Sequence, residues 1–261
     1  MGSGYCGGTH CAYESISLAA MAQLPVGYRS PCMGSDGFAV ILGVGFPISV
    51  WLIVYLVTHK LSFGVAASLA TWFSAVAVLG KIGFFAQTPL IAPNIIFAFL
   101  FLFIVLRHFY QSATLRAIAD RIPPHWIIAV HIWRIGGVGF ITLYFAGILP
   151  AEFAFPSGIG DIAVGVTAPI VAYFYFLKKS FSRTLAIIWN YIGFADLLLA
   201  VLLGNLAYPE PFPPLIDGQI LSTSVSTGAF ALYPLALIPL FAVPLSLLLH
   251  AFSLRALKRA A

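Results

Sequence analysis

Residues 184–206 read TLAIIWNYIGFADLLLAVLLGNL, and this stretch decides the class of fold. Its one charged residue, Asp196, stands within an otherwise almost wholly apolar run. A helix of about twenty such residues rises about 30 Å, which matches the hydrocarbon core of a bilayer. The stretch therefore predicts a membrane-spanning helix with a carboxylate placed in lipid.

Similar runs recur along the chain. Windows of about nineteen residues predict spans at 37–58, 62–80, 90–106, 126–149, 158–177, 184–206 and 229–250. Charged residues make up 8% of the chain and the mean hydropathy is +1.01, values unsuited to a fold whose surface faces water. The runs are apolar on all faces, whereas the strands of a membrane barrel alternate apolar and polar residues. The sequence therefore predicts an all-α polytopic membrane protein, a bundle of about seven transmembrane helices.

The distribution of charge predicts the orientation of this bundle. Cations gather in alternate connections and at the C-terminus, at Lys60, Arg107, Arg116, Arg121, Lys178, Lys179, Arg183, Arg255, Lys258 and Arg259. Cytoplasmic loops are enriched in Lys and Arg, so we expect the N-terminus outside and the C-terminus in the cytoplasm. The predicted parts are an external N-terminal tail over 1–36, a seven-helix domain over 37–250 and a basic cytoplasmic tail over 251–261.

The net charge of +5 is spread over loop ends rather than gathered in a basic domain. We therefore expect anionic membrane lipids as partners, and no nucleic acid. A multi-pass protein of a cell membrane, most simply a bacterial inner membrane, fits this pattern. The N-terminal tail holds the three cysteines, Cys6, Cys11 and Cys32, whose pairing stays open and whose spacing fits no standard zinc pattern.

Charged groups inside the bilayer are costly unless they are paired or hydrated, so each one marks a functional hypothesis. His131 and Arg134 stand three residues apart in the fourth span, on one helical face. Arg134 lies on the order of 12 Å from the cytoplasmic end of its span, and Asp196 on the order of 18 Å from that of its own. These compatible depths predict that Arg134 and Asp196 approach each other, directly or through water.

Two further polar residues complete the predicted site. Asp161 follows Pro-Ser-Gly-Ile-Gly at 156–160, so we place it in the first turn of the fifth span, near the outer face, with Ser157 as the cap. Asn190 lies nearer the cytoplasm in the sixth span and extends the polar track. The predicted substrate or proton pathway is His131, Arg134, Asp161, Asn190 and Asp196; the alternative is a buried pair that only fixes helix register.

Four histidines form a second constellation. His59, His108, His125 and His250 fall at the predicted cytoplasmic ends of the first, third, fourth and seventh spans. One layer of imidazoles there is an alternative set of ligands for haem b or a metal. The predicted boundaries put no two histidines at matched depth in mid-membrane, so we favour no cofactor and no metal.

Three functions follow from these features. The favoured one is a transporter or permease for a small solute or ion, because of the buried polar site. A haem- or metal-binding redox protein or lipid-modifying enzyme would use the histidine layer instead. A non-catalytic accessory subunit, within an oligomer or a membrane complex, would need the polar residues only for helix packing. No complete catalytic motif appears, so enzymatic activity stays open. Prolines at 234, 239 and 244 predict a kinked last span.

Overall fold

The computed structural model describes residues 63–86, 120–208 and 225–259, together with separate positions between 100 and 117. Secondary structure in these residues is helical, without a strand. The predicted span 37–58, the N-terminal tail with its cysteines, His59 and His108 lie outside the described residues, as does most of the span at 90–106. The prediction of an all-helical fold is confirmed, and the count of seven spans stays a prediction.

Within the described part of the chain, four helical segments are long and apolar enough to cross a membrane, as expected for a membrane protein. They are Pro124–Phe145, made of α7 (Pro124–Ala129), η3 (Val130–Gly137) and α8 (Val138–Phe145); α9 (Ala151–Phe176); α10 (Ser182–Leu206); and Ile238–Arg259, made of η5 (Ile238–Ala242) and α11 (Val243–Arg259). The other elements are α4 (Phe63–Lys81), η2 (Phe84–Ala86) and η4 (Thr227–Ala231).

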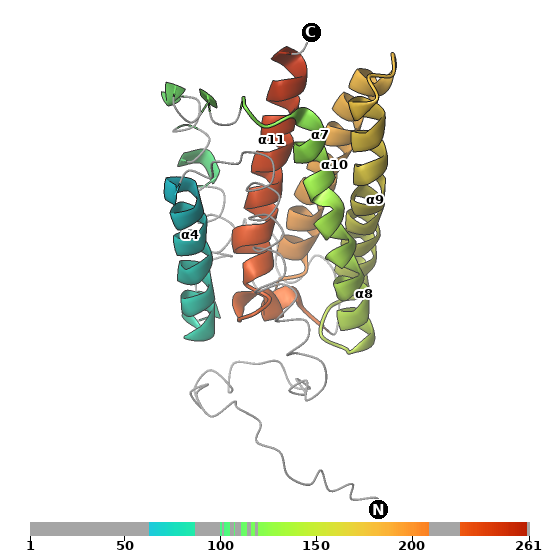
Figure 1. Cartoon of the computed structure of the whole chain (residues 1–261). Helices are drawn as coiled ribbons and strands as arrows, with labels where there is room; N and C mark the ends of the chain where they lie inside the picture. The colour runs from blue at the N-terminus through green and yellow to red at the C-terminus, as the bar shows by residue number, and fades with distance from the viewer. Residues whose placement is uncertain are drawn as a thin grey trace, which may run out of the picture.

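The long helices run alongside one another in a bundle (Figure 1). α9 packs against α7, η3 and α8 on one side and against α10 on the other. α11 contacts both α10 and α7, and η5 contacts α4. This order brings η3, α9, α10 and α11 around a common interior, where the polar site lies.

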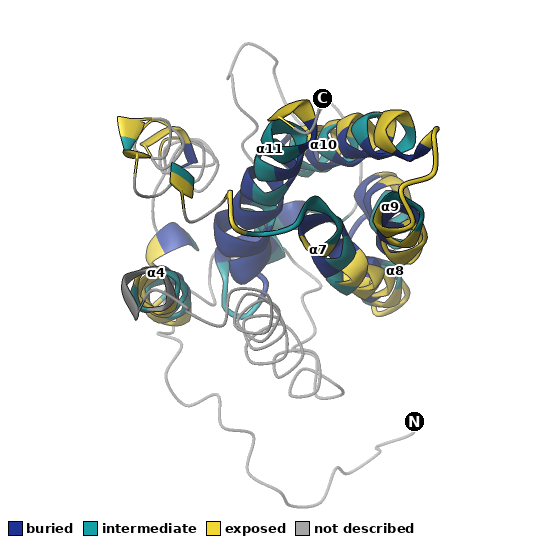
Figure 2. Ribbon diagram, turned by 45° about the horizontal axis from the view of Figure 1, so that its top comes forward, coloured by how far each residue is buried: buried dark blue, intermediate teal, exposed yellow. Residues whose placement is uncertain are grey.

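Burial differs sharply between the helices of the bundle (Figure 2). In the most apolar stretch of the last span 67% of the residues are buried, against 28% in both α9 and α10. Large apolar side chains such as Ile159, Ile170, Ile192 and Leu202 are exposed on these two helices. An apolar surface of this extent is suited to lipid rather than to water. The last span is therefore the core of the bundle, and α9 and α10 offer lipid-facing sides.

A proline in the last span creates the attachment point for α4. Pro244 has no N–H, so it cannot bond to the carbonyl of Leu240 four residues earlier. The indole Nε1 of Trp72 on α4 donates to that carbonyl at 3.1 Å. The five residues just before α11, η5, form a π-helix, which is rare and is found mostly as a single turn next to α-helix. A hydrogen bond lost within one helix is thus replaced by one between two helices.

Two predicted span boundaries are wrong. α9 begins at Ala151 rather than at residue 158, with Pro156 inside the helix and Ser157 buried instead of capping it. The last long helix covers Ile238–Arg259 rather than 229–250, after a cis Tyr233–Pro234 bond. Proline is tolerated in the first turn of a helix, where few N–H groups have intrahelical partners, as at Pro239 near the start of η5. Pro156 and Pro169 instead lie inside α9, where each removes one hydrogen bond of the helix.

Charged residues from three chain segments gather at one end of the bundle. Arg259 forms an ion pair with Asp120, and Arg255 lies 3.6 Å from the same carboxylate. Nε of Arg183, next to the connection between α9 and α10, donates to the carbonyl of Leu257 at 3.1 Å. Partial burial raises the pKa of the Asp120 carboxyl, but its bond to Arg259 and both positive charges outweigh this and hold the pKa below 3.8. These connections share one side, as predicted from their charge.

Candidate functional site: a buried arginine between two carboxylates

Arg134 is the centre of the polar site. It lies in η3 and its side chain is 0% exposed. The backbone of η3 touches α9 closely, because a Cβ at Gly165 would lie only 2.5 Å from the backbone nitrogen of Ile135. Glycine at 165 therefore permits the approach that holds the Arg134 backbone against α9.

Two helices each supply a carboxylate to this arginine. Nε of Arg134 donates to Oδ1 of Asp161 at 2.6 Å, and Nη2 donates to Oδ2 of Asp196. Nη1 donates to the carbonyl of Gly193 at 3.3 Å. The predicted approach of Arg134 and Asp196 is confirmed, and it is direct. Asp161 joins the same guanidinium, a contact that the sequence analysis did not predict.

The charges of this cluster do not balance. When all three side chains are ionised, one guanidinium faces two carboxylates, so the cluster has one negative charge in excess. The Asp161 and Asp196 side chains are only 16% and 12% exposed. An unbalanced charge is costly in a site of this depth. A single proton or monovalent cation neutralises the cluster.

Asp161 lies in a different place from the one we predicted. It is ten residues beyond Ala151, about 15 Å along α9. The expectation of a first-turn carboxylate near the outer face is therefore wrong, because α9 begins a full two turns earlier. The helix N-terminus does not explain the position of this carboxylate, and its partner is Arg134 instead.

His131 and His250 stack against each other beside the arginine. Their ring centroids are 4.0 Å apart with an interplanar angle of 34°, and the Trp189 ring lies 5.3 Å from both. The two histidines are 0% exposed. His250 thus lies within the last span and not at its end, and the expectation that no two histidines share a depth is wrong.

Hydrogen-bond partners assign the tautomer of each histidine. Nδ1 of His131 donates to the carbonyl of Ile127 at 3.0 Å, since a carbonyl only accepts. Nε2 of His131 is buried and has no hydrogen-bond partner among the described residues. Nε2 of His250 lies 3.4 Å from Nη1 of Arg134, where it accepts. Both rings are therefore assigned as neutral, with the proton on Nδ1.

Asn190 fixes the second histidine. Its amide nitrogen donates to the Ala186 carbonyl at 2.8 Å and to Oγ of Ser253 at 3.0 Å. Its Oδ1 is thereby left to accept from Nδ1 of His250 at 2.9 Å. All five residues of the predicted pathway thus converge, because His250 links Asn190 to Arg134 and stacks on His131.

Two members of the alternative ligand set for haem or metal, His125 and His250, lie among the described residues, and they have different neighbours. His59 and His108 lie outside the described residues, so the set as a whole stays a prediction. The ring of His125 contacts Trp126 and Phe176, whereas His250 is with His131. The stacked rings do not point two ring nitrogens at a common ion, and Nε2 of His250 faces a cation. The described part of the chain also holds no group of three or more His, Cys, Asp or Glu suited to a metal.

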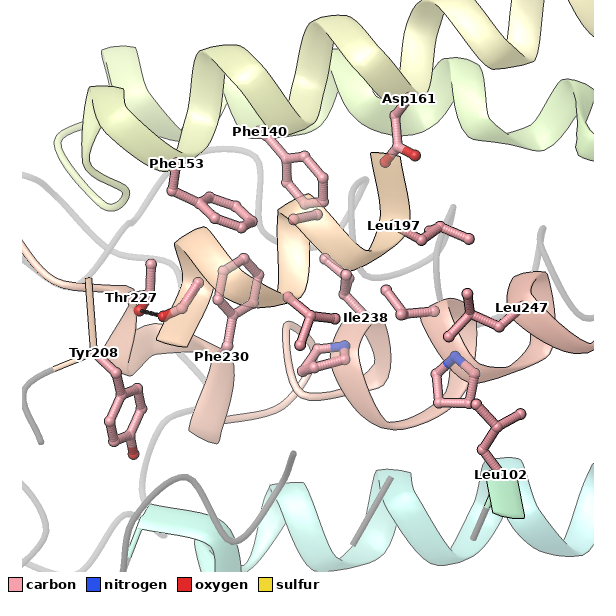
Figure 3. Close-up of a pocket in the computed structure, with 16 residues that line it drawn as sticks. Leu102, Phe140, Phe153, Asp161, Leu197, Tyr208, Thr227, Phe230, Ile238 and Leu247 are labelled. Carbon is pink, nitrogen blue, oxygen red and sulfur yellow. Dashed lines mark hydrogen bonds between the residues drawn. The ribbon is translucent and has the colours of Figure 1, made fainter. Parts of the chain in front are cut away.

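A cavity opens beside the carboxylates (Figure 3). It measures about 70 Å³ and is lined almost entirely by apolar side chains from α8, α9, α10 and the last span. Asp161 lines it at one end, and Tyr208 and Thr227 line it at the other. Oγ1 of Thr227 donates to the carbonyl of Gly204 at 2.6 Å. Among the described residues, Asp161 is thus the one acidic group in the wall of this cavity.

Comparison with protein families places the chain. The family described as Domain of unknown function (DUF8737) matches residues 90–258. The chain belongs to the DUF8737 family. The matched residues of this DUF8737 protein include the whole Arg134 cluster and the cavity wall. No curated protein and no solved structure matches the chain.

Sequence reasoning missed parts of the site in this DUF8737 protein. The sequence predicts His250 only as a ligand in a peripheral layer, and it does not predict the aromatic wall of the cavity. A usable signal was present: Ser246, His250 and Ser253 repeat at spacings of four and three, and all three are 0% exposed. A polar stripe in an apolar span indicates a face turned toward other polar groups.

Proposed function

We propose that this chain is a permease that moves a small solute or ion and exchanges a proton or monovalent cation at Arg134, Asp161 and Asp196. The observation that carries the proposal is one guanidinium shared by two carboxylates from two helices, which leaves one negative charge unbalanced. Membrane transporters use such buried charged groups as relays and coupling sites. A bacterial inner membrane, with the basic end of the bundle in the cytoplasm, is the setting we propose.

Cation exchange at this site has a mechanical consequence. Arg134 connects η3 to α9 through Asp161 and to α10 through Asp196. Neutralising either carboxylate weakens one of the two connections and leaves the other intact. Occupancy of the site by a proton or cation thereby alters the relative stability of two arrangements of α9 and α10, which is what coupling requires.

The test is electrical. The full chain is reconstituted into proteoliposomes on a solid-supported membrane, and currents are recorded after rapid jumps in pH, Na⁺ or K⁺. We expect a transient current from the wild type and at least a tenfold smaller current from Asp196→Asn, which keeps the side-chain shape but removes the charge. Asp120→Asn, at the basic end, is the matched control and retains the current.

Two results contradict the proposal. One is the absence of current from folded wild-type protein under all three jumps. The other is a current of equal size in wild type and Asp196→Asn. Either result favours an accessory subunit in which the polar residues only organise helices, since buried ion pairs are exchangeable for apolar packing.

A further inference from the structure

The cavity exposes one unused carboxylate oxygen. Both contacts of Asp161 with Arg134 are made through Oδ1, from Nε and from Nη2, each at 2.6 Å. Oδ2 has no hydrogen bond among the described residues, although Asp161 forms part of the cavity wall. Figure 3 shows the Asp161 carboxylate turned toward Leu197 across the cavity. An anionic acceptor at an apolar cavity wall calls for a cation there.

A second polar atom lies unused on the same stripe of α9. Phe153, Ser157 and Asp161 are spaced by four residues, so they share one face of the helix. Ser157 is 2% exposed, and its Oγ has no hydrogen-bond partner among the described residues. A buried polar atom without a partner costs about 1–3 kcal/mol. Phe153 and Asp161, which flank it, both line the cavity.

Aromatic rings form the middle of the cavity wall. Phe153 lies 5.3 Å from Phe140 and 5.1 Å from Phe230 between ring centroids, and Phe140 lies 6.1 Å from Phe230. The three rings come from α8, α9 and η4, and all three line the cavity. Aromatic faces attract cations, and alkylated ammonium groups above all suit such walls.

We propose that this cavity binds a small methylated ammonium group, with its charge on Asp161 and its methyl groups against the phenylalanines. One such cation balances the excess negative charge of the Arg134 cluster. A single free carboxylate oxygen matches a single N–H, as in trimethylammonium. The site is poorer for Na⁺ or K⁺, which need several oxygen ligands, and for methylammonium, two of whose three N–H groups would lack acceptors.

The size of the cavity agrees with this ligand class. A cavity of about 10–15 Å³ holds one water, and this cavity measures about 70 Å³. It therefore has room for roughly five to seven water-sized groups, which is enough for the four non-hydrogen atoms of trimethylammonium. The inference deepens the proposed function. It rests on that function for the movement of the ligand across the membrane, whereas binding itself does not require transport.

A pair of ligands tests the inference without any variant. The full chain in lipid nanodiscs is titrated at pH 7 with trimethylammonium and with 2-propanol, a neutral molecule of the same shape and number of non-hydrogen atoms. We expect calorimetry to show at least tenfold tighter binding of trimethylammonium. Equal affinity for both molecules would show an apolar cavity without charge recognition and would overturn the inference.

Matched variants locate the binding. Asp161→Asn should weaken trimethylammonium at least tenfold and leave 2-propanol unchanged, while Glu152→Gln, exposed on the same helix, changes neither. Phe230→Leu keeps an apolar wall but removes a ring face, and should weaken trimethylammonium about threefold to tenfold. Its control is Phe145→Leu, at a ring that is 76% exposed. Unchanged affinity in folded Asp161→Asn overturns the inference; if that variant does not fold, unchanged affinity in Phe230→Leu does so.

The two proposals fail separately. Tight trimethylammonium binding without a current after jumps in pH, Na⁺, K⁺ or trimethylammonium supports the ligand site and contradicts transport. Currents after pH jumps that depend on Asp196, without preference for trimethylammonium over 2-propanol, support cation exchange and overturn the ligand site.

Discussion

At the scale of single residues, the absence of a side chain at Gly193 leaves the space that His250 and Arg134 occupy. A Cβ there would lie 2.5 Å from Cε1 of His250 and 3.3 Å from Nη1 of Arg134. His250 cannot simply withdraw, because Asn190 and His131 hold its ring. We expect Gly193→Ala to lower the free energy of unfolding by about 1–3 kcal/mol through overpacking, measured by thermal denaturation in detergent.

The control for this substitution is Gly136→Ala on η3. A Cβ at Gly136 meets nothing within 4 Å. Alanine has a higher helix propensity than glycine by about 0.5–1 kcal/mol, so this variant should be neutral or slightly stabilised. Equal losses of stability in both variants would contradict the crowding that we describe around His250.

The residues of the site differ in how far the sequence could predict them. Arg134 and Asp196 were paired correctly, because a charge in lipid needs a partner and their depths agreed. Asp161 and His250 were misplaced by whole helical turns, since their depths depended on span boundaries that prolines obscured. The hydropathy of a span is nearly constant along its length, so it locates the span far better than it locates the ends.

At the scale of elements, Pro244 removes a hydrogen bond within the last span, and Trp72 of α4 replaces it with one between two helices. We expect Trp72→Phe to lower the free energy of unfolding by about 1–3 kcal/mol. The Leu240 carbonyl then loses the indole N–H that donates to it in place of the backbone N–H that Pro244 lacks. Thermal denaturation in detergent measures the loss. Trp126→Phe, at a ring that is 41% exposed, is the control and should change stability far less.

A double-mutant cycle isolates this hydrogen bond. Pro244→Ala restores an N–H that can bond to the Leu240 carbonyl within the helix. Trp72→Phe should therefore cost less in the Pro244→Ala background than in the wild type, with a coupling of about 0.5–1.5 kcal/mol. Strict additivity of the two changes would show that Trp72 acts only through its apolar packing.

At the scale of the whole molecule, the bundle is organised around its last span. That span is the most buried of the four and contributes His250 and part of the cavity wall. The sequence alone predicts the class of fold, because apolar runs of this length are typical of membrane-spanning helices. It did not identify which span is central, since an apolar side chain gives the same hydropathy whether it faces lipid or a neighbouring helix.

Orientation in the membrane is a property of the whole bundle, and it sets the direction of any cation exchange. The connection between α9 and α10 lies at the basic end, and the turn after α8 lies at the other end (Figure 1). With the three native cysteines replaced by serine, we introduce Ser180→Cys or Ala146→Cys, both at exposed positions. By the positive-inside rule, a membrane-impermeant maleimide should label Ala146→Cys in intact cells but Ser180→Cys only after permeabilisation. The reverse pattern would place the basic end of the bundle outside the cell. The part of the site that holds His250 and Asn190 would then lie toward the outer face.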